Sequence, residues 1–166
     1  PFETETQLLR RSFHLFVDLL LPYFVISRYL RDRASVNDAL GALFVCGLIV
    51  APIAIFERFK GWLLYESVYL RWQEVDFAIF LMRDTALRAM AGSGHALVLG
   101  HFLVVCFGLL GIYRMELKGL RLVTVWALLT LALYATVSRG PWVAAAIVVL
   151  TMGLFTGKVL KFYGLA

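Results

Sequence analysis

Five apolar runs, separated by polar segments, make up most of the chain. They cover residues 13–30, 39–56, 95–113, 122–137 and 141–157. As helices, runs of roughly 16 to 20 residues can cross a hydrocarbon core about 30 Å thick, the shortest of them with help from flanking arginines and aromatics. The pattern therefore predicts an all-α integral membrane protein, with five spanning helices in a single transmembrane domain over residues 1–166.

The longest polar stretch, residues 57–94, has a pattern of its own. Aromatic side chains recur there at helical spacing with charged residues between them, at Trp62, Tyr65, Tyr69 and Trp72. This pattern favours a helix lying in the headgroup layer of a membrane. A second amphipathic helix is expected over residues 77–90, ended by the Ala-Gly-Ser-Gly step at 91–94. We therefore expect residues 57–94 to form an interfacial outer loop.

Composition supports a membrane protein and excludes one class of partner. Hydrophobic residues make up 61% of the 166, whereas soluble domains have roughly 45–50%. The net charge is +5, but the basic residues are scattered over loops and run ends, so we expect no nucleic acid partner. Cys46 and Cys106 lie inside apolar runs, where a thiol acts as a small hydrophobe. Because the sequence opens with Pro1 and not Met, we expect it to be part of a longer protein.

The alternation of runs and loops predicts which segments share a side of the membrane. If each run crosses once, the loop 57–94 and Arg139 lie on one side, with the N-terminus, and the connectors 31–38 and 114–121 lie on the other. Basic residues are denser in these short connectors, which places them in the cytoplasm and Arg139 outside. The arginine pair at 10–11, directly before the first run, favours the opposite orientation.

A short polar break, Val137-Ser138-Arg139-Gly140-Pro141-Trp142, separates the last two runs. The Gly-Pro step can turn a helical hairpin without a charge beside it. Arg139 is therefore either an anchor that reaches the headgroups, with Trp142 in the aromatic belt, or a ligand for an anion. A guanidinium can hold phosphate oxygens with two parallel hydrogen bonds, and the helix that begins at Pro141 would add its dipole. The residues alone favour neither interpretation.

Two arginines of the loop, Arg83 and Arg88, are predicted to lie on the same side as Arg139. Asp84 and Arg88 are four residues apart, so on a helix they could be no more than a surface ion pair. Arginines from the loop and from the hairpin on one face would nevertheless suit a diphosphate-bearing substrate.

Other polar residues are weaker candidates. His95, at the start of the third run, could act as a base, although a lone histidine there is more often structural. His101 is expected to join two helices, and Asp18 to face the helix bundle. Glu74 and Asp76 form a weak candidate for Mg²⁺. The sequence has no metal-ligand spacing, P-loop, dinucleotide fingerprint or nucleophile elbow.

Two stretches carry a resemblance to a known family. In the first, Arg88 is followed by Gly94-His95-Ala96-Leu97-Val98-Leu99-Gly100, and in the second, two spans later, stands Ser138-Arg139-Gly140-Pro141-Trp142. Together they resemble the O-antigen ligase and O-antigen polymerase superfamily of bacterial envelope proteins. That family has an Arg, a Gly-rich step and a His or Asn before an apolar run, and later a Ser-Arg-Gly at a helix mouth. Ala96 departs from the pattern, since the family usually has Pro there. The family also has more spans, and a long outer loop with a further His that does not occur in these 166 residues.

The resemblance implies a metal-independent glycosyltransferase of the membrane-embedded GT-C type in the bacterial inner membrane. It implies transfer of a glycan from an undecaprenyl diphosphate carrier to an acceptor glycan or lipid at the periplasmic face, without a cofactor. Arg88 and Arg139 would neutralise the diphosphate, with Arg83 and Ser138 also binding it and His95 shaping the catalytic site. The catalytic base is expected outside these residues, and the oligomeric state is left open.

Two other functions remain open. A fragment of a multi-span transporter or channel would be expected to line a path with polar residues from several spans, whereas the runs contain few ionisable groups. A non-catalytic membrane scaffold would need the arginines only as anchors.

Overall fold

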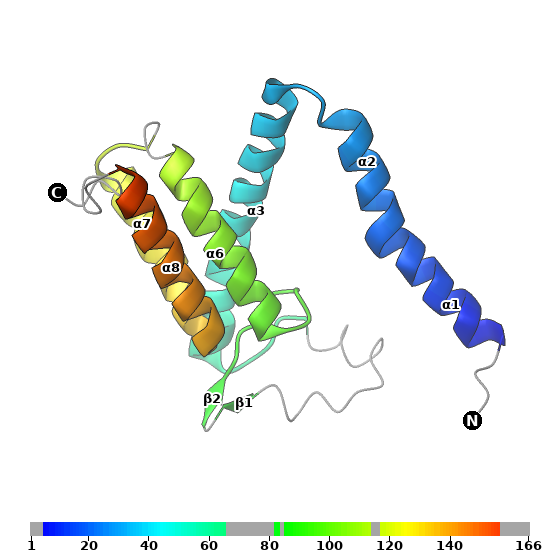
Figure 1. The fold of residues 1–166 in the computed structure, drawn as a ribbon. Coiled ribbons are helices and arrows are strands. Elements are labelled where there is room, and N and C mark those ends of the chain that lie inside the picture. Colours follow the sequence, from blue (N-terminus) through cyan, green and yellow to red (C-terminus); the bar gives the residue numbers. More distant parts are fainter. Residues whose placement is uncertain (1–4, 66–81, 84, 114–116, 157–166) are drawn as a thin grey trace. The chain divides into compact units, whose positions relative to one another are not determined.

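The computed structural model describes residues 5–65, 82–83, 85–113 and 117–156 (Figure 1). Its contacts divide the chain into two units, Pro1–Ala42 and Leu43–Ala166, each of which is described by itself. Within the described residues the structure is all-α except for one small hairpin, with five helical rods.

The first unit contains one long helical rod. α1 (Glu5–Leu15), the π-helical turn η1 (Phe16–Leu20) and α2 (Leu21–Tyr29) follow one another without a break, and all their side chains are exposed. Pro22 lies in the first turn of α2 and has no backbone N–H to donate to the turn before it, which is a local reason for the change of helical pitch.

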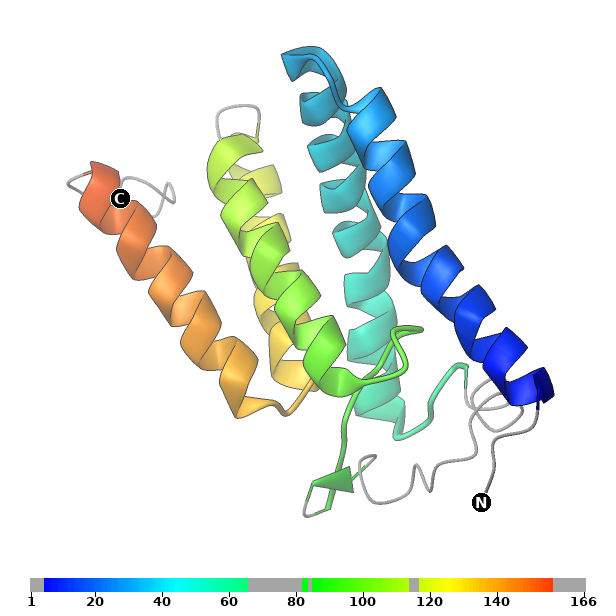
Figure 2. The ribbon, with the colours of Figure 1, turned by 45° about the vertical axis from the view of Figure 1, so that its right-hand side comes forward.

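The second unit is built on four helices. α3 (Arg33–Lys60) begins in the first unit and continues into the second, where α6 (Ala96–Tyr113), α7 (Leu120–Ala135) and α8 (Arg139–Thr156) follow (Figures 1 and 2). α6 packs against both α7 and α8. The largest fully buried leucines come from α6 and α7: Leu99, Leu103, Leu110, Leu129 and Leu133.

Small residues allow α6 to approach its neighbours closely. A Cβ added at Gly100 would lie 2.4 Å from Cγ of Pro141 in α8, and one added at Gly47 in α3 would meet the Sγ atom of Cys106 at 2.3 Å. Neither position has room for a methyl group. Small residues let two helix backbones approach closely and so gain van der Waals contacts.

The five predicted runs correspond to the five helical rods. The second run extends to Arg33–Lys60 as α3, and the last three become α6, α7 and α8 with ends within two residues of the prediction. Two helices of the described part, α3 and α6, are long and apolar enough to cross a membrane. This finding concerns length and composition alone, and α7 and the described part of α8 are shorter apolar helices.

The loop 57–94 differs from the prediction. Residues 57–60 complete α3, the helix ends at Gly61 (φ 64°), and residues 62–65 are not helical. The rest of the predicted aromatic helix lies outside the described residues. β1 (Met82–Arg83) and β2 (Ala86–Leu87) form an antiparallel hairpin, so the helix predicted over residues 77–90 is wrong from residue 82 onward. The reason is tertiary, because the N–H groups of Ala89 and Met90 bond to α7 and α3 instead of to a preceding helical turn.

Candidate anion-binding site

The turn between α7 and α8 is the centre of the site. α7 ends at Ala135, α8 begins at Arg139, and the break lies two residues earlier than predicted. Val137 has φ 47°, a left-handed conformation that is rare for a β-branched residue. Thr136 and Ser138 on either side of it are buried. The backbone here is therefore fixed in an unusual shape by its surroundings.

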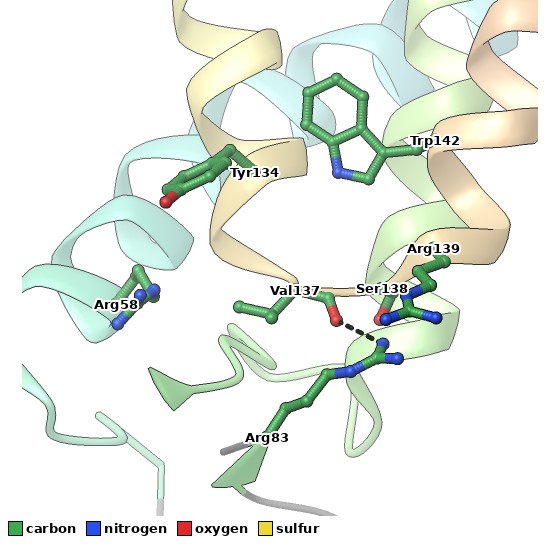
Figure 3. Close-up of a pocket in the computed structure, with 7 residues that line it drawn as sticks. All are labelled: Arg58, Arg83, Tyr134, Val137, Ser138, Arg139 and Trp142. Carbon is green, nitrogen blue, oxygen red and sulfur yellow. Dashed lines mark hydrogen bonds between the residues drawn. The ribbon is translucent and has the colours of Figure 1, made fainter. Parts of the chain in front are cut away.

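The loop segment bonds directly to this turn. Nη1 of Arg83 donates to the carbonyl of Val137 at 3.2 Å, the one dashed bond in Figure 3. Nη2 of Arg88 donates to Oγ of Ser138 at 2.7 Å, and its Nε lies 3.5 Å from the carbonyl oxygen of Thr136. The loop and the α7–α8 turn meet, as predicted. Arg83 lies on a strand and Arg88 on non-helical backbone, and not on the predicted helix.

A backbone bond and a side-chain bond reinforce the contact. The N–H of Ala89 donates to the carbonyl of Ala135 at 3.0 Å. The hydroxyl of Ser138 donates to the carbonyl of Thr136 at 3.1 Å while it accepts from Arg88. Three consecutive carbonyls, at 135, 136 and 137, thus face the segment from β1 to Ala89.

A pocket of about 300 Å³ opens beside the turn (Figure 3). Its lining consists of Arg58, Arg83, Tyr134, Val137, Ser138, Arg139 and Trp142. Three of these side chains are guanidinium groups, and none of the described lining residues carries a carboxylate. In Figure 3, Arg83 and Arg139 lie near Ser138, and Arg58 extends from α3 on the other side of the opening. The pocket is therefore electropositive and open to solvent.

Arg88 supports the pocket from the loop side. Partial burial lowers the pKa of its guanidinium, and the positive charge of Arg83 lowers it further. Arginine nevertheless stays charged at neutral pH, because its ordinary pKa lies far above it. Several permanent cations close together repel one another, and a bound anion would offset that repulsion.

The structure places the predicted histidines outside the pocket lining. Nδ1 of His95 accepts the backbone N–H of Leu97 at 3.1 Å, at the start of α6. That bond occupies the Nδ1 lone pair and leaves Nε2 to carry the proton in the neutral ring. His101 is exposed, and its Nδ1 lies 2.8 Å from the carbonyl oxygen of Leu97 in its own helix. This bond within one helix differs from the predicted link between two helices.

Other predictions cannot be placed. Asp84 lies outside the described residues, so its ion pair with Arg88 stays a prediction, and so does the acidic pair at 74 and 76. Within the described part of the chain, no group of three or more His, Cys, Asp and Glu side chains could hold a metal ion.

Three residues of the site were missed by the sequence interpretation. Arg58 and Tyr134 line the pocket, and Glu57 binds the loop backbone. Tyr134 lies in the last turn of α7, and its closeness along the sequence to the Ser138-Arg139 break could have identified it. No local pattern marks Glu57 or Arg58. Met90 and Ala91, which bond to Glu57, and the residues that line the pocket with Arg58 lie far along the sequence.

A second pocket lies between α6, α7 and α8. It has a volume of about 440 Å³, and its lining is largely apolar, including Phe107, Trp126, Leu133 and Leu150. Trp142 lines both pockets, so its ring forms part of the boundary between a basic opening and an apolar groove.

No protein-family model, curated protein or solved structure matches the chain. The function is therefore argued from the residues of the site, and the family resemblance stays a prediction.

Proposed function

We propose that the chain is the donor-binding part of a membrane glycosyltransferase of the O-antigen ligase or polymerase type. It binds the diphosphate of an undecaprenyl diphosphate-linked glycan, and the glycan passes to an acceptor sugar at the periplasmic face. One observation carries the proposal: Arg83 and Arg88 of the loop meet the α7–α8 turn beside Arg139. These are the positions at which the resemblance expects diphosphate ligands.

The charge of the pocket supports a diphosphate ligand. Arg58, Arg83 and Arg139 present guanidinium groups to one opening, and each can bind two phosphate oxygens in parallel. The first turn of α8, which begins at Arg139, adds free N–H groups and the positive end of its dipole. The Ser138 hydroxyl accepts from Arg88 while it donates to the carbonyl of Thr136, and so it holds that guanidinium at the turn. Such a site stabilises the charge that develops on a leaving diphosphate.

The apolar groove supports a lipid-linked donor. It shares the lining residue Trp142 with the basic pocket, so a ligand with an anionic head and an apolar chain would match the two lining chemistries. α3 and α6 are long and apolar enough to span a membrane. Large apolar side chains are exposed on α6, α7 and α8, among them Val105, Leu131 and Ile147, as expected for lipid contact.

The proposed reaction needs a base that the pocket does not supply. An acceptor hydroxyl attacks the anomeric carbon, the bond from that carbon to the phosphate oxygen breaks, and the diphosphate leaves with the electron pair. The hydroxyl proton passes to a base. The guanidiniums stay protonated and so stabilise the leaving group instead of accepting this proton. Their role here is therefore electrostatic.

Replacement of Arg139 by Lys tests the proposal. The probe is farnesyl diphosphate, titrated by calorimetry into the purified full natural chain in detergent. Lysine keeps the charge but loses the bidentate grip, so we expect binding to weaken about tenfold or more. Arg121→Lys is the matched control, since Arg121 lies on α7 near the helix end away from the turn, and it should leave binding unchanged.

Two results would contradict the proposal. If Arg139→Lys binds farnesyl diphosphate as tightly as the natural protein, Arg139 is only an anchor. That result would favour a non-catalytic membrane scaffold. If the natural protein, reconstituted in vesicles with carrier-linked glycan from the source cell, moves the glycan across the bilayer without transferring it, the chain belongs to a transporter. Transfer of the glycan to an acceptor, if it is lost in Arg139→Lys and kept in Arg121→Lys, would support the proposed glycosyltransferase activity.

A further inference from the structure

A buried carboxylate directly precedes Arg58, a lining residue of the basic pocket. Glu57, in the last turn of α3, is fully buried. Its Oε2 atom accepts the N–H of Met90 at 2.9 Å and the N–H of Ala91 at 2.8 Å, and Oε1 accepts the N–H of Leu64 at 3.1 Å. A buried carboxylate with three backbone donors is well satisfied, and bonds to a charged acceptor are stronger than neutral ones.

These bonds fix the segment that carries Arg88. On one side Glu57 holds Met90 and Ala91, and on the other Ala89 donates to the carbonyl of Ala135. Ala91 has φ 44°, an unfavourable conformation for an alanine that its bond to Glu57 helps to maintain. Arg88 is thus attached to a backbone held from both sides, which aims its guanidinium at Ser138.

The same carboxylate fixes the end of α3, and with it Arg58. Successive helical side chains point about 100° apart, so Glu57 faces the loop backbone while Arg58 lines the pocket. Nε of Arg58 is buried and has no hydrogen-bond partner in the described part of the chain. Arg58 follows Glu57 directly in the last turn of α3, so the bonds from the loop to Glu57 hold the backbone from which Arg58 extends.

We infer that Glu57 is a positioning residue of the basic pocket, one that presents Arg58 and Arg88 to the anionic ligand without touching it. The inference rests on the proposed function only in that the ligand is a diphosphate. A carboxylate is required because all three partners are donors. A glutamine of the same shape would turn its own NH₂ group toward N–H groups and lose at least one bond.

The first test is free of ligand. Hydrogen exchange is compared between the natural protein and Glu57→Gln in detergent. Positioning predicts a larger rise in exchange in residues 88–91 than in the buried part of α6, residues 99–110. Equal exchange at 88–91 would overturn the inference, and so would a uniform rise in both segments, which would show a general loss of stability. If Glu57→Gln does not fold, Glu57→Asp is used. It keeps the charge but shortens the reach by one methylene, so the same pattern is expected to a smaller extent.

The second test measures the effect on the arginines. Glu57→Gln should weaken farnesyl diphosphate binding about tenfold, measured well below the unfolding temperature. In a background that already carries Arg58→Ala and Arg88→Ala, the same change should have little further effect, because it acts through those two residues. An undiminished effect in that background would overturn the inference. Absence of binding by the natural protein would instead count against the proposed function, and the exchange result would still decide the role of Glu57.

Discussion

Two carboxylates lie at opposite ends of α3, Asp32 just before its first residue and Glu57 in its last turn, and they bind different kinds of partner. Asp32 precedes the helix, is exposed, and bonds to Ser35 three residues away: the Ser35 hydroxyl donates at 2.6 Å and its N–H at 3.1 Å. Glu57 lies in the last turn of the helix and is buried. It accepts from backbone N–H groups that are seven, 33 and 34 residues away. Asp32 caps its own helix, whereas Glu57 joins α3 to the segment that supports the basic pocket.

The difference teaches where a polar residue matters. An exposed cap competes with water, so its loss is partly compensated by solvent. A buried acceptor has no such substitute, and each N–H it serves is left without a partner when it is removed. The two ends of one helix should therefore respond very differently to the same substitution.

The largest effect is expected from Glu57→Ala. Three buried N–H groups lose their acceptor, and the free energy of unfolding should fall by on the order of 3 kcal/mol or more. Thermal and denaturant unfolding in detergent, followed by circular dichroism, measures this, with Asp32→Ala as the matched control. If the two variants were equally stable, the contrast between buried and exposed carboxylates would be wrong.

A smaller loss of stability is expected from Gly100→Ala. This variant tests whether an uncharged long-range contact responds to substitution as strongly as the buried Glu57 carboxylate does. The new methyl group would overlap Pro141, and such overpacking lowers the free energy of unfolding by about 1–3 kcal/mol. Gly108→Ala on the same helix is the control, because its Cβ would meet only Val148 at 3.9 Å. It should be neutral or slightly stabilising. A loss of the same size in both variants would mean that helix packing near Pro141 is not special.

The smallest effect is expected at Asp32, and it depends on pH. Bonds from the Ser35 hydroxyl, and then from its N–H, lower the pKa of the Asp32 carboxyl below its ordinary value of 3.8. The contribution to stability is therefore fully present above pH 3.8 and is lost as the pH falls through the lower folded pKa. The NMR shift of the Ser35 amide should follow this titration, and in Asp32→Asn it should not. A midpoint above 3.8 would contradict the cap geometry.

The helices were largely predictable from the sequence. Apolar runs of this length are too long for ordinary strands and favour helices, and α6, α7 and α8 end close to the predicted residues. The loop was predicted less well. Arg83 and Arg88 were selected correctly as partners of the 138–139 region, but on a helix, because helical spacing of their neighbours outweighed any signal for a hairpin.

The sequence by itself determined the five helices and the break near Arg139, because each depends on residues within one or two turns of one another. The tertiary structure alone decided that Arg58 lines the pocket, that residues 82–87 form a hairpin and that Glu57 binds Met90 and Ala91. The physical reason is the origin of the partners. The backbone N–H groups that satisfy Glu57 belong to no side-chain pattern, and only the packing of α3 against the loop brings them to its carboxylate.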